Sequence, residues 1–289
     1  MKYIIKNFIQ KIKKILNFKK KRYEEDLVLR GKILIDTIKN KTPIEINDIE
    51  LKIFSQFGDD GIIQYLINKL EIEEKYFNFI EFGVENYLES NTRFLLINNN
   101  WSGLILDASE KNIHQIKNSS FFWKHDLEAK SCFINKSNIN NILLESKLDK
   151  NNIGILSIDI DGNDYWILKE IYSFVKPEII ILEYNASFLD KSISVPYHDN
   201  FERHSFHKSG FYHGASINAF YKLLSEDYFL IESIGGNNLI FLRKDKLKND
   251  IKTLTPNKAN KEPLLRNKWS GKKAKEQWEE IKCLDYIEI

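Results

Sequence analysis

Three acidic residues stand close together in LSIDIDGNDYWIL, residues 156–168. An apolar run typical of a buried strand reaches Asp159 and Asp161, and a helical pattern begins near Asp164. Residues two apart on a strand share a face, so the first two carboxylates are expected to point the same way. They repel each other unless a positive charge lies nearby, and a divalent cation is one such charge. A helix cap formed by Asp161 or Asn163 is the simpler alternative for one acid, but not for both.

A second set of oxygen donors follows the next predicted strand. The run EIIILEYN contains Glu183 and Asn185, again two residues apart. Parallel strands end at the same edge of a sheet, so Asp161, Glu183 and Asn185 are expected to converge there. This all-oxygen set suits Mg²⁺ or Ca²⁺ better than zinc. Because acidic clusters at strand ends also occur without a metal, both interpretations stay open.

The segment 186–214 is a long insertion that contains four of the six histidines. Loops of this length inside a compact domain are usually functional. His213 directly precedes a predicted helix start, so it is expected near the ligand edge of the sheet, where it would act as a general base. A packed or surface histidine is the alternative reading. The spacing of His204 and His207 is only a weak metal signal.

The earlier predicted strands end on residues suited to a cationic, ribose-containing ligand. In FNFIEFGVEN, Gly83 permits a tight turn, and Glu81 and Glu85 place carboxylates beside it. Asp107 is positioned to accept hydrogen bonds from both hydroxyls of a ribose or to help cap the following helix. Asp126 ends a weaker predicted strand, FFWKHD, and is expected on the adenine side. The three-glycine spacing that binds a pyrophosphate is missing.

Strands and helices must alternate to bring these residues together. The pattern predicts an α/β fold, with a mostly parallel Rossmann-like sheet closed by a C-terminal antiparallel hairpin. The predicted strands span 77–83, 103–108, 121–126, 154–160 and 178–184, the hairpin spans 228–244, and the helices between them span 88–98, 109–117, 138–148 and 164–174.

Three parts of the chain are predicted. Residues 1–45 form a basic helical extension, 46–245 the main domain, and 246–289 a charged tail expected to wrap the domain as a helix. The extension comprises an amphipathic helix, with Ile5, Phe8, Ile12, Ile15 and Leu16 at helical spacing, and a second polar helix over about 23–40.

Composition narrows the setting in which the protein works. The net charge of +2 does not indicate a general nucleic-acid binder, and two distant cysteines do not form a metal-like motif. No run approaches the length of a membrane span, so a cytoplasmic location is expected. Residues 1–22 carry basic residues and no acid, so their helix is predicted either to lie on the inner membrane surface or to pack against the protein or a second copy in a homo-oligomer.

Taken together, the motifs resemble the FkbM-like branch of S-adenosylmethionine-dependent methyltransferases. The resemblance covers roughly residues 50–245 and is carried by FSQFGDDGIIQYL, FIEFGVENYLESNTRFLL, GLILDAS, LSIDIDGNDYWIL, EIIILEYN, VPY and GASINAF. It implies a class I fold and O-methylation of a hydroxyl on a sugar, a surface-glycan precursor or a natural product, with S-adenosylmethionine as methyl donor and Mg²⁺ as a metal that related enzymes use.

The resemblance also implies roles for particular residues. Glu81, Gly83 and Glu85 match the motif at the methionine end of the cofactor, Asp107 the ribose-binding acid, and Asp126 the adenine side. Gln56, Asp60 and Asp159 are expected near the cofactor as well. Asp161 and His213 are the expected catalytic residues, and the implied metal ligands are Asp161, Glu183 and Asn185.

Three other classes of protein were weighed. A nicotinamide-dependent oxidoreductase would need the missing glycine fingerprint. A nucleic-acid methyltransferase would use the basic N-terminus, but DIDGND stands where base-amino methylation has an Asn/Asp-Pro-Pro-aromatic motif. A catalytically silent methyltransferase fold that serves as a binding module is the third.

Overall fold

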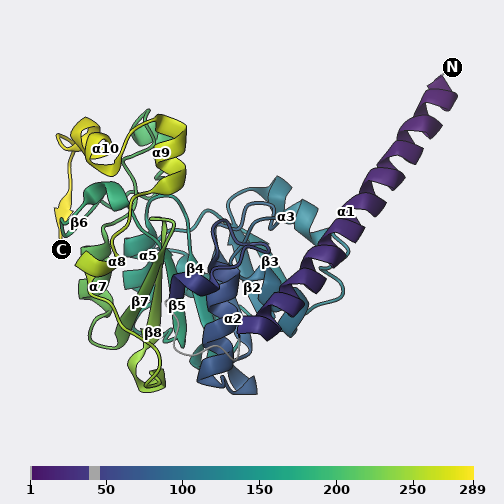
Figure 1. Ribbon diagram of the computed structural model, residues 1–289. Coiled ribbons are helices and arrows are strands. Elements are labelled where there is room, and N and C mark those ends of the chain that lie inside the picture. The colour runs from purple at the N-terminus through teal and green to yellow at the C-terminus, as the bar shows by residue number, and fades with distance from the viewer. Residues whose placement is uncertain (1, 39–45) are drawn as a thin grey trace.

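The computed structural model describes residues 2–38 and 46–289 and is built around one seven-stranded sheet (Figure 1). Five strands are parallel, and the last two form an antiparallel hairpin, in the order β3-β2-β1-β4-β5-β8-β7. Their bounds are β1 Asn78–Phe82, β2 Ser102–Asp107, β3 Leu127–Ser131, β4 Ile155–Ile158, β5 Ile179–Glu183, β7 Tyr228–Ile234 and β8 Asn238–Arg243. The predicted fold class, a Rossmann-like methyltransferase sheet with a terminal hairpin, is confirmed.

Helices cover both faces of the sheet. Successive strand residues point to opposite faces, so Phe79 joins one apolar core and Ile80 the other. α2 and α3 pack on the first face, and α4, α5 and α7 on the second. The helices are α2 Asp59–Leu70, α3 Glu110–Lys117, α4 Ile139–Leu144, α5 Asp164–Ile171, α6 Arg203–Phe206 and α7 Ile217–Leu224.

The N-terminal extension is one helix, α1 Lys2–Ile38, and not the two that were predicted. Its first half projects away from the rest of the molecule (Figure 1). Its second half is held by an ion pair between Glu24 and the buried Arg93, 3.1 Å apart, and by Ile35 in a small apolar cluster. The side chains of the predicted apolar stripe, Ile5, Phe8, Ile12, Ile15 and Leu16, lie outside the described part, so the membrane contact stays a prediction. None of the described helices is both long and apolar enough to cross a bilayer.

Two further predictions about the elements are wrong. Residues 121–126 form a turn, and the third strand follows at Leu127–Ser131. Instead of a helix over 88–98, residues 88–92 form bends and irregular backbone that lead into a short helical stretch including Leu95–Asn99.

The C-terminal tail is a set of short elements and not a single helix. They are α8 Pro256–Ala259, α9 Leu264–Ser270, α10 Ala274–Ile281 and β9 Ile287–Glu288. β9 pairs with β6 Ile193–Ser194 of the insertion. α10 packs on the insertion through a separate apolar cluster that includes Phe188 and Ile281. The tail therefore braces the insertion against the domain.

Candidate active site

A cavity of about 730 Å³ lies at the carboxyl ends of the parallel strands. One side is lined by residues that follow β1, β2 and β3, and this side is called the cofactor half below. The other side is lined by residues after β4 and β5, by the insertion and by α9, and is called the acceptor half. In open α/β sheets this edge is where ligands bind.

Gly83 ends β1 with a φ of +80°, in a conformation that glycine tolerates best. A β-carbon at this position would lie 1.6 Å from the backbone oxygen of Asp159, so the ends of β1 and β4 touch here. Only glycine allows this approach, and the predicted tight turn is present. Whether it contacts a cofactor stays a prediction.

Glu81 lines the cavity, but its carboxylate is largely engaged in hydrogen bonds within the protein. Its carboxylate accepts hydrogen bonds from the Ser90 hydroxyl at 2.6 Å, the Asn91 amide at 2.9 Å and the Thr92 hydroxyl at 2.5 Å. Burial raises the pKa of Glu81 although these donors lower it. Glu81 thus holds segment 90–92, which forms part of the cavity wall.

Asp107 ends β2 and lines the cofactor half while remaining 9% exposed. One oxygen accepts from the Glu85 amide at 2.7 Å, and the other from the Ser109 amide at 2.9 Å and the Asn112 side chain at 3.1 Å. Ser109 is the N-cap of α3. Asp107 therefore supports the start of α3 and also lines the cavity, while its binding of a ribose stays a prediction.

The predicted adenine-side residue Asp126 lies at the wrong end of the sheet. Its backbone oxygen accepts from Gly103 at the start of β2, and its side chain accepts from Ser102. The error follows from the misplaced third strand. The residues that line the cavity after the true β3 are Cys132, Phe133 and Ile134.

Gln56 and Asp60, both predicted near the cofactor, have different positions. Gln56 lines the cavity and donates to Glu89 at 3.1 Å. Asp60 is buried and is not part of the lining; one oxygen accepts three backbone amides, from Ile53, Phe54 and Ser55, at 2.6–2.8 Å. Burial raises its pKa to about 6. Asp60 fixes the shape of the loop that carries Gln56 and does not contact the cavity.

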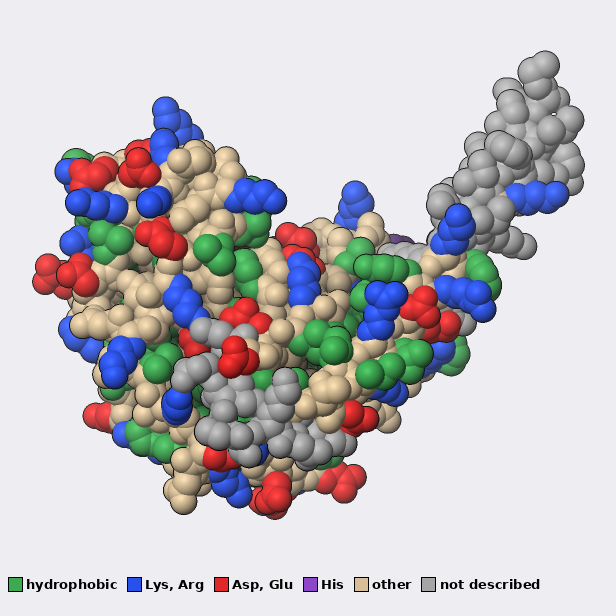
Figure 2. Space-filling view, in the orientation of Figure 1, with side chains coloured by type: hydrophobic (Ala, Val, Ile, Leu, Met, Phe, Trp, Pro, Cys, Tyr) green, Lys and Arg blue, Asp and Glu red, His purple; other side chains and the backbone are tan. Residues whose placement is uncertain are grey.

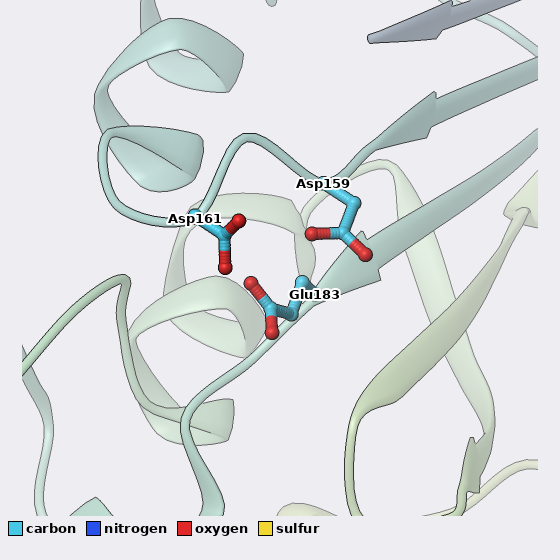
Figure 3. A group of neighbouring side chains, drawn as sticks. All are labelled: Asp159, Asp161 and Glu183. Atoms are coloured by element: carbon cyan, nitrogen blue, oxygen red, sulfur yellow. The ribbon is translucent and has the colours of Figure 1, made fainter. Parts of the chain in front are cut away.

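Asp159, Asp161 and Glu183 point toward one another at the ends of β4 and β5 (Figure 3). One oxygen from each lies within 4.8 Å of the others. Figure 3 shows Asp159 and Asp161 on the loop that leaves β4 and Glu183 at the end of β5. The predicted convergence of acids is therefore present, with Asp159 as its third member.

Two arginines supply positive charge to this cluster. Nη1 of Arg203 lies 2.6 Å from Asp161 Oδ1 and 3.9 Å from Glu183 Oε1. The side chain of Arg203 is 16% exposed. Arg266, which is buried, also interacts electrostatically with Glu183. Arg203 comes from the insertion and Arg266 from α9, and no sequence motif marks either residue.

The surroundings of these acids shift their pKa values in opposite directions. Burial alone would raise the pKa of Glu183, but His213, Arg203 and Arg266 lower it, so Glu183 is ionised. Burial and the charge of Glu183 raise the pKa of Asp159 well above its usual value. They also raise that of Asp164 to about 7.

Asp164 does not point into the cavity. Its carboxylate accepts the backbone amides of Ile160 and Gly162 at 2.8 and 2.9 Å, at the start of α5. It therefore shapes the loop that presents Asp159 and Asp161. Asp164 therefore supports the start of α5, and not Asp161 or Asn163, the two residues considered as its cap from the sequence.

Asn185 does not join the acidic cluster as a ligand. Its oxygen accepts from Arg266 Nη1 at 2.7 Å and from the Ser187 amide at 3.1 Å. Its amide nitrogen donates to the backbone oxygens of Phe211 and His213. Because the Asn185 oxygen already accepts from Arg266 and Ser187, Asn185 is not available as the third ligand of the predicted metal site. The acids Asp159, Asp161 and Glu183 do have the spacing of a metal site, and Arg203 pairs with Asp161 there.

His213 is fully buried behind Glu183 and is not among the residues that line the cavity. Its Nε2 lies 3.7 Å from Glu183 Oε1 and has no hydrogen-bond partner among the described residues. Burial and the charge of Arg203 lower its pKa to about 3, so the ring is neutral. The prediction that His213 contacts the acceptor as a base is not supported by this position. His204 is the insertion histidine that lines the cavity.

Comparison with known proteins gives structural likeness only. No protein-family model matches the chain, and no curated protein does. It is similar to an O-methyltransferase from Bacillus cereus in complex with SAH, at 12% identity and a TM-score of 0.40, over 75% of this chain and 91% of that one. The SAH-bound N-terminal domain of EvdMO1 gives 11% identity and a TM-score of 0.39, over 69% and 97%.

A SAM-dependent methyltransferase from Aquifex aeolicus is similar at 8% identity and a TM-score of 0.35, over 69% of this chain and 98% of that one. Likeness at this level does not carry a function from one protein to another. The strand order and register therefore carry the conclusion that the chain has a Rossmann-like methyltransferase fold.

Proposed function

We propose that the protein is an S-adenosylmethionine-dependent methyltransferase of the FkbM-like branch that transfers a methyl group to a hydroxyl oxygen. One observation carries the proposal. A single cavity joins a glycine turn and the strand-end carboxylate of Asp107 on one side to an ionised carboxylate, Glu183, flanked by arginines on the other.

The charge of the cofactor half is complementary to S-adenosylmethionine. The Gly83 turn brings the ends of β1 and β4 together at the cavity, and Asp107 offers a carboxylate to ribose hydroxyls. Phe133 and Ile134 provide an apolar wall suited to adenine. The carboxylates that line this half suit a ligand that carries an amino group and a sulfonium. When bound, S-adenosylmethionine would supply an electrophilic methyl group.

Glu183 is the residue best placed to take the proton of an acceptor hydroxyl. It lines the cavity and is ionised. A hydroxyl that donates to its carboxylate would be oriented for methylation, and orientation accounts for much of the rate of such reactions. As the oxygen gains the methyl group, its proton passes to the carboxylate. Asp161 keeps Arg203 in position beside it.

No step is assigned to a metal. The positive charge expected near the acids is present as Arg203 and Arg266. His213 acts in this proposal as a neutral neighbour that restricts Glu183 from behind.

The test is calorimetric titration of the full chain with S-adenosylmethionine and S-adenosylhomocysteine, for wild type, Asp107→Asn and Asp126→Asn. Loss of charge-assisted hydrogen bonds predicts affinity at least tenfold weaker for Asp107→Asn. Asp126→Asn is the matched control, an aspartate at the far end of the sheet, and should bind as wild type. Thermal unfolding of each variant separates loss of binding from loss of fold.

The same titration separates the alternatives. Wild-type binding without transfer to any hydroxyl compound would favour the silent binding module. No binding of either ligand would contradict the proposal. The acidic lining of the cavity does not favour a nucleic-acid substrate, because it repels phosphates. On the face shown in Figure 2, acidic and basic side chains are interspersed, unlike a phosphate-binding surface.

A further inference from the structure

We propose that residues 264–275, a short basic segment at the mouth of the cavity, dock on an anionic lipid bilayer, so that the cavity opens at the membrane surface. The segment comprises α9 and the start of α10 and is called the α9 rim below. It is a different surface from the N-terminal segment 1–22, and the proposal does not depend on methyl transfer.

Two large apolar side chains of the α9 rim face solvent. Leu264 is 64% exposed and Trp269 is 70% exposed. Trp269 also lines the cavity, together with Leu265 and Ser270 of the same helix. An exposed indole suits the boundary between lipid head groups and acyl chains, because its ring is apolar and its N–H donates a hydrogen bond. The α9 rim is therefore both a wall of the cavity and an apolar edge beside its mouth.

Lysines surround these two side chains. The α9 rim carries four lysines and no acid, and Lys268, Lys273 and Lys275 are exposed. The fourth, Lys272, pairs with Glu280 of α10. Exposed apolar side chains supply buried area, and lysines beside them supply attraction to anionic head groups, so together they suit a protein that lies on a membrane. The acids of α10 are each engaged with a lysine or a backbone amide, and they are Glu276, Glu279 and Glu280.

The α9 rim is held in place by buried polar side chains. The guanidinium of Arg266 donates to Asn185 at 2.7 Å. The side-chain amide of Gln277 donates at 2.8 Å to the side chain of Asn267 and to the backbone oxygen of Lys272. The exposed indole is thus presented by a fixed helix, and docking orders little further backbone.

The composition of the α9 rim favours lipid over a protein partner. Two exposed apolar side chains are few beside the roughly 20 residues a side of a stable protein interface, and lysine is depleted from such interfaces. Segment 1–22 also carries basic residues and no acid, and its helix rises on the same side of the molecule as α9 (Figure 1). Stable attachment to a bilayer takes two such contacts. The two segments together supply them.

Vesicle binding by the full chain tests the proposal. Co-sedimentation would use vesicles of phosphatidylcholine alone and of phosphatidylcholine with phosphatidylglycerol in a two-to-one ratio. Trp269→Ala and Leu264→Ala should each weaken binding to the anionic vesicles about three- to tenfold, the effect of one lost interfacial side chain. Trp123→Ala is the matched control and should bind as wild type. Trp123 is 74% exposed and has Lys124 over its ring, but it lies in a turn at the amino ends of the strands, away from the cavity.

Two further measurements separate insertion from charge. Lipids brominated on their acyl chains quench indole fluorescence on contact, so this quenching should fall in Trp269→Phe and be unchanged in Trp123→Phe. The double variant Lys268→Gln, Lys273→Gln should weaken vesicle binding at low salt and have little effect at high salt, where charge is screened. Thermal unfolding of each variant separates loss of binding from loss of fold.

Binding of wild type to anionic vesicles that Trp269→Ala and Leu264→Ala leave unchanged would assign the contact to segment 1–22 alone and overturn the proposal. Absence of binding, or equal effects at Trp269 and Trp123, would also overturn it. So would a concentration-dependent dimer in sedimentation velocity that Trp269→Ala abolishes without changing vesicle binding, because the α9 rim would then join two copies of the chain. Failure of S-adenosylmethionine to bind in calorimetry would contradict only the proposed function.

Discussion

Substitution of Arg203 by glutamine tests the statement that an arginine, and not a metal, balances the acidic cluster. Arg203 contacts Asp161 at 2.6 Å and lies 3.9 Å from Glu183, whose side chain is only 6% exposed. Asp161 is 62% exposed and can be hydrated after the substitution. Glu183 is buried and cannot be hydrated in the same way. The substitution therefore removes a positive charge from beside a buried carboxylate.

The expected loss can be bounded. Two unit charges 3.9 Å apart interact by about 4 kcal/mol at an effective dielectric constant of 20. Arg266 remains beside Glu183, and glutamine keeps some hydrogen-bonding capacity. We therefore expect the free energy of unfolding at pH 7 to fall by about 2 kcal/mol, below the range for a completely broken buried pair.

The ionisation of Glu183 sets the pH range over which the loss is present. In wild type the pKa of Glu183 is lowered, so its ionised form adds stability that is present above the unfolded-state pKa and lost as pH falls through the folded-state pKa. Without Arg203 the folded-state pKa rises, but a loss of about 2 kcal/mol corresponds to a rise in that pKa of only about 1.5. Glu183 therefore stays ionised in both proteins down to about pH 4.5, so the gap between variant and wild type should be full across this range and narrow only at lower pH.

Urea unfolding at pH 7.5, 6 and 4.5 measures this gap. Arg243→Gln is a matched control, since Arg243 is 18% exposed and also joins an exposed and a buried acid, Asp245 and Glu178. Its effect should be smaller and insensitive to pH in this range, because Lys246 remains 2.7 Å from Glu178. A change below about 0.5 kcal/mol for Arg203→Gln, or one that has disappeared at pH 4.5, would refute the role given to Arg203.

Four further outcomes are expected. Gly83→Ala should weaken S-adenosylhomocysteine binding in calorimetry at least tenfold and lower the Tm, because its β-carbon meets Asp159 and its φ is positive; unchanged affinity would contradict the turn's role. Gln277→Ala should destabilise by about 1–2 kcal/mol in urea, because it removes a buried 2.6 Å bond to Ser187, and a neutral effect would mean the tail does not brace the insertion. Mg²⁺ should leave the wild-type Tm unchanged in a thermal scan, whereas a clear rise would restore the metal interpretation. Vesicles containing anionic lipid should co-sediment with the full chain at low salt and release it at high salt, and binding to neutral vesicles alone would contradict the electrostatic basis predicted for residues 1–22.

The strand ends that carry the site were predictable because buried parallel strands are dense in large apolar residues. Gly83, Asp107, Asp159 and Glu183 each follow such a run, and the sheet then places them along one edge. The hairpin was predictable for a similar reason, since a glycine-rich turn separates two apolar runs. These features depend on local pattern and a general rule of sheet topology.

The third strand was misplaced because it lies at the edge of the sheet. LEAKS alternates buried and more exposed residues and lacks apolar density, whereas the aromatic FFW just before it resembled a strand. The shift moved the expected adenine contact from the 132–134 segment to Asp126. Edge strands with one solvated face give a weaker signal than buried ones.

The arginines and Trp269 were missed because nothing local marks them. Arg203 lies in a four-residue helix within the insertion, and Arg266 and Trp269 lie on a tail helix that reaches the cavity only through long-range packing. The burial of His213 could not be predicted either, because a residue that precedes a helix can face the cavity or the core. Tertiary packing decides which of the two it faces.

The measurement that tests the central claim most directly is hydrogen–deuterium exchange of the full chain with and without S-adenosylhomocysteine. The account predicts protection of the backbone around residues 83–87, 107–109 and 132–134, the three strand ends of the cofactor half. No protection at saturating ligand, or protection centred on 121–126 with none at 132–134, would contradict it.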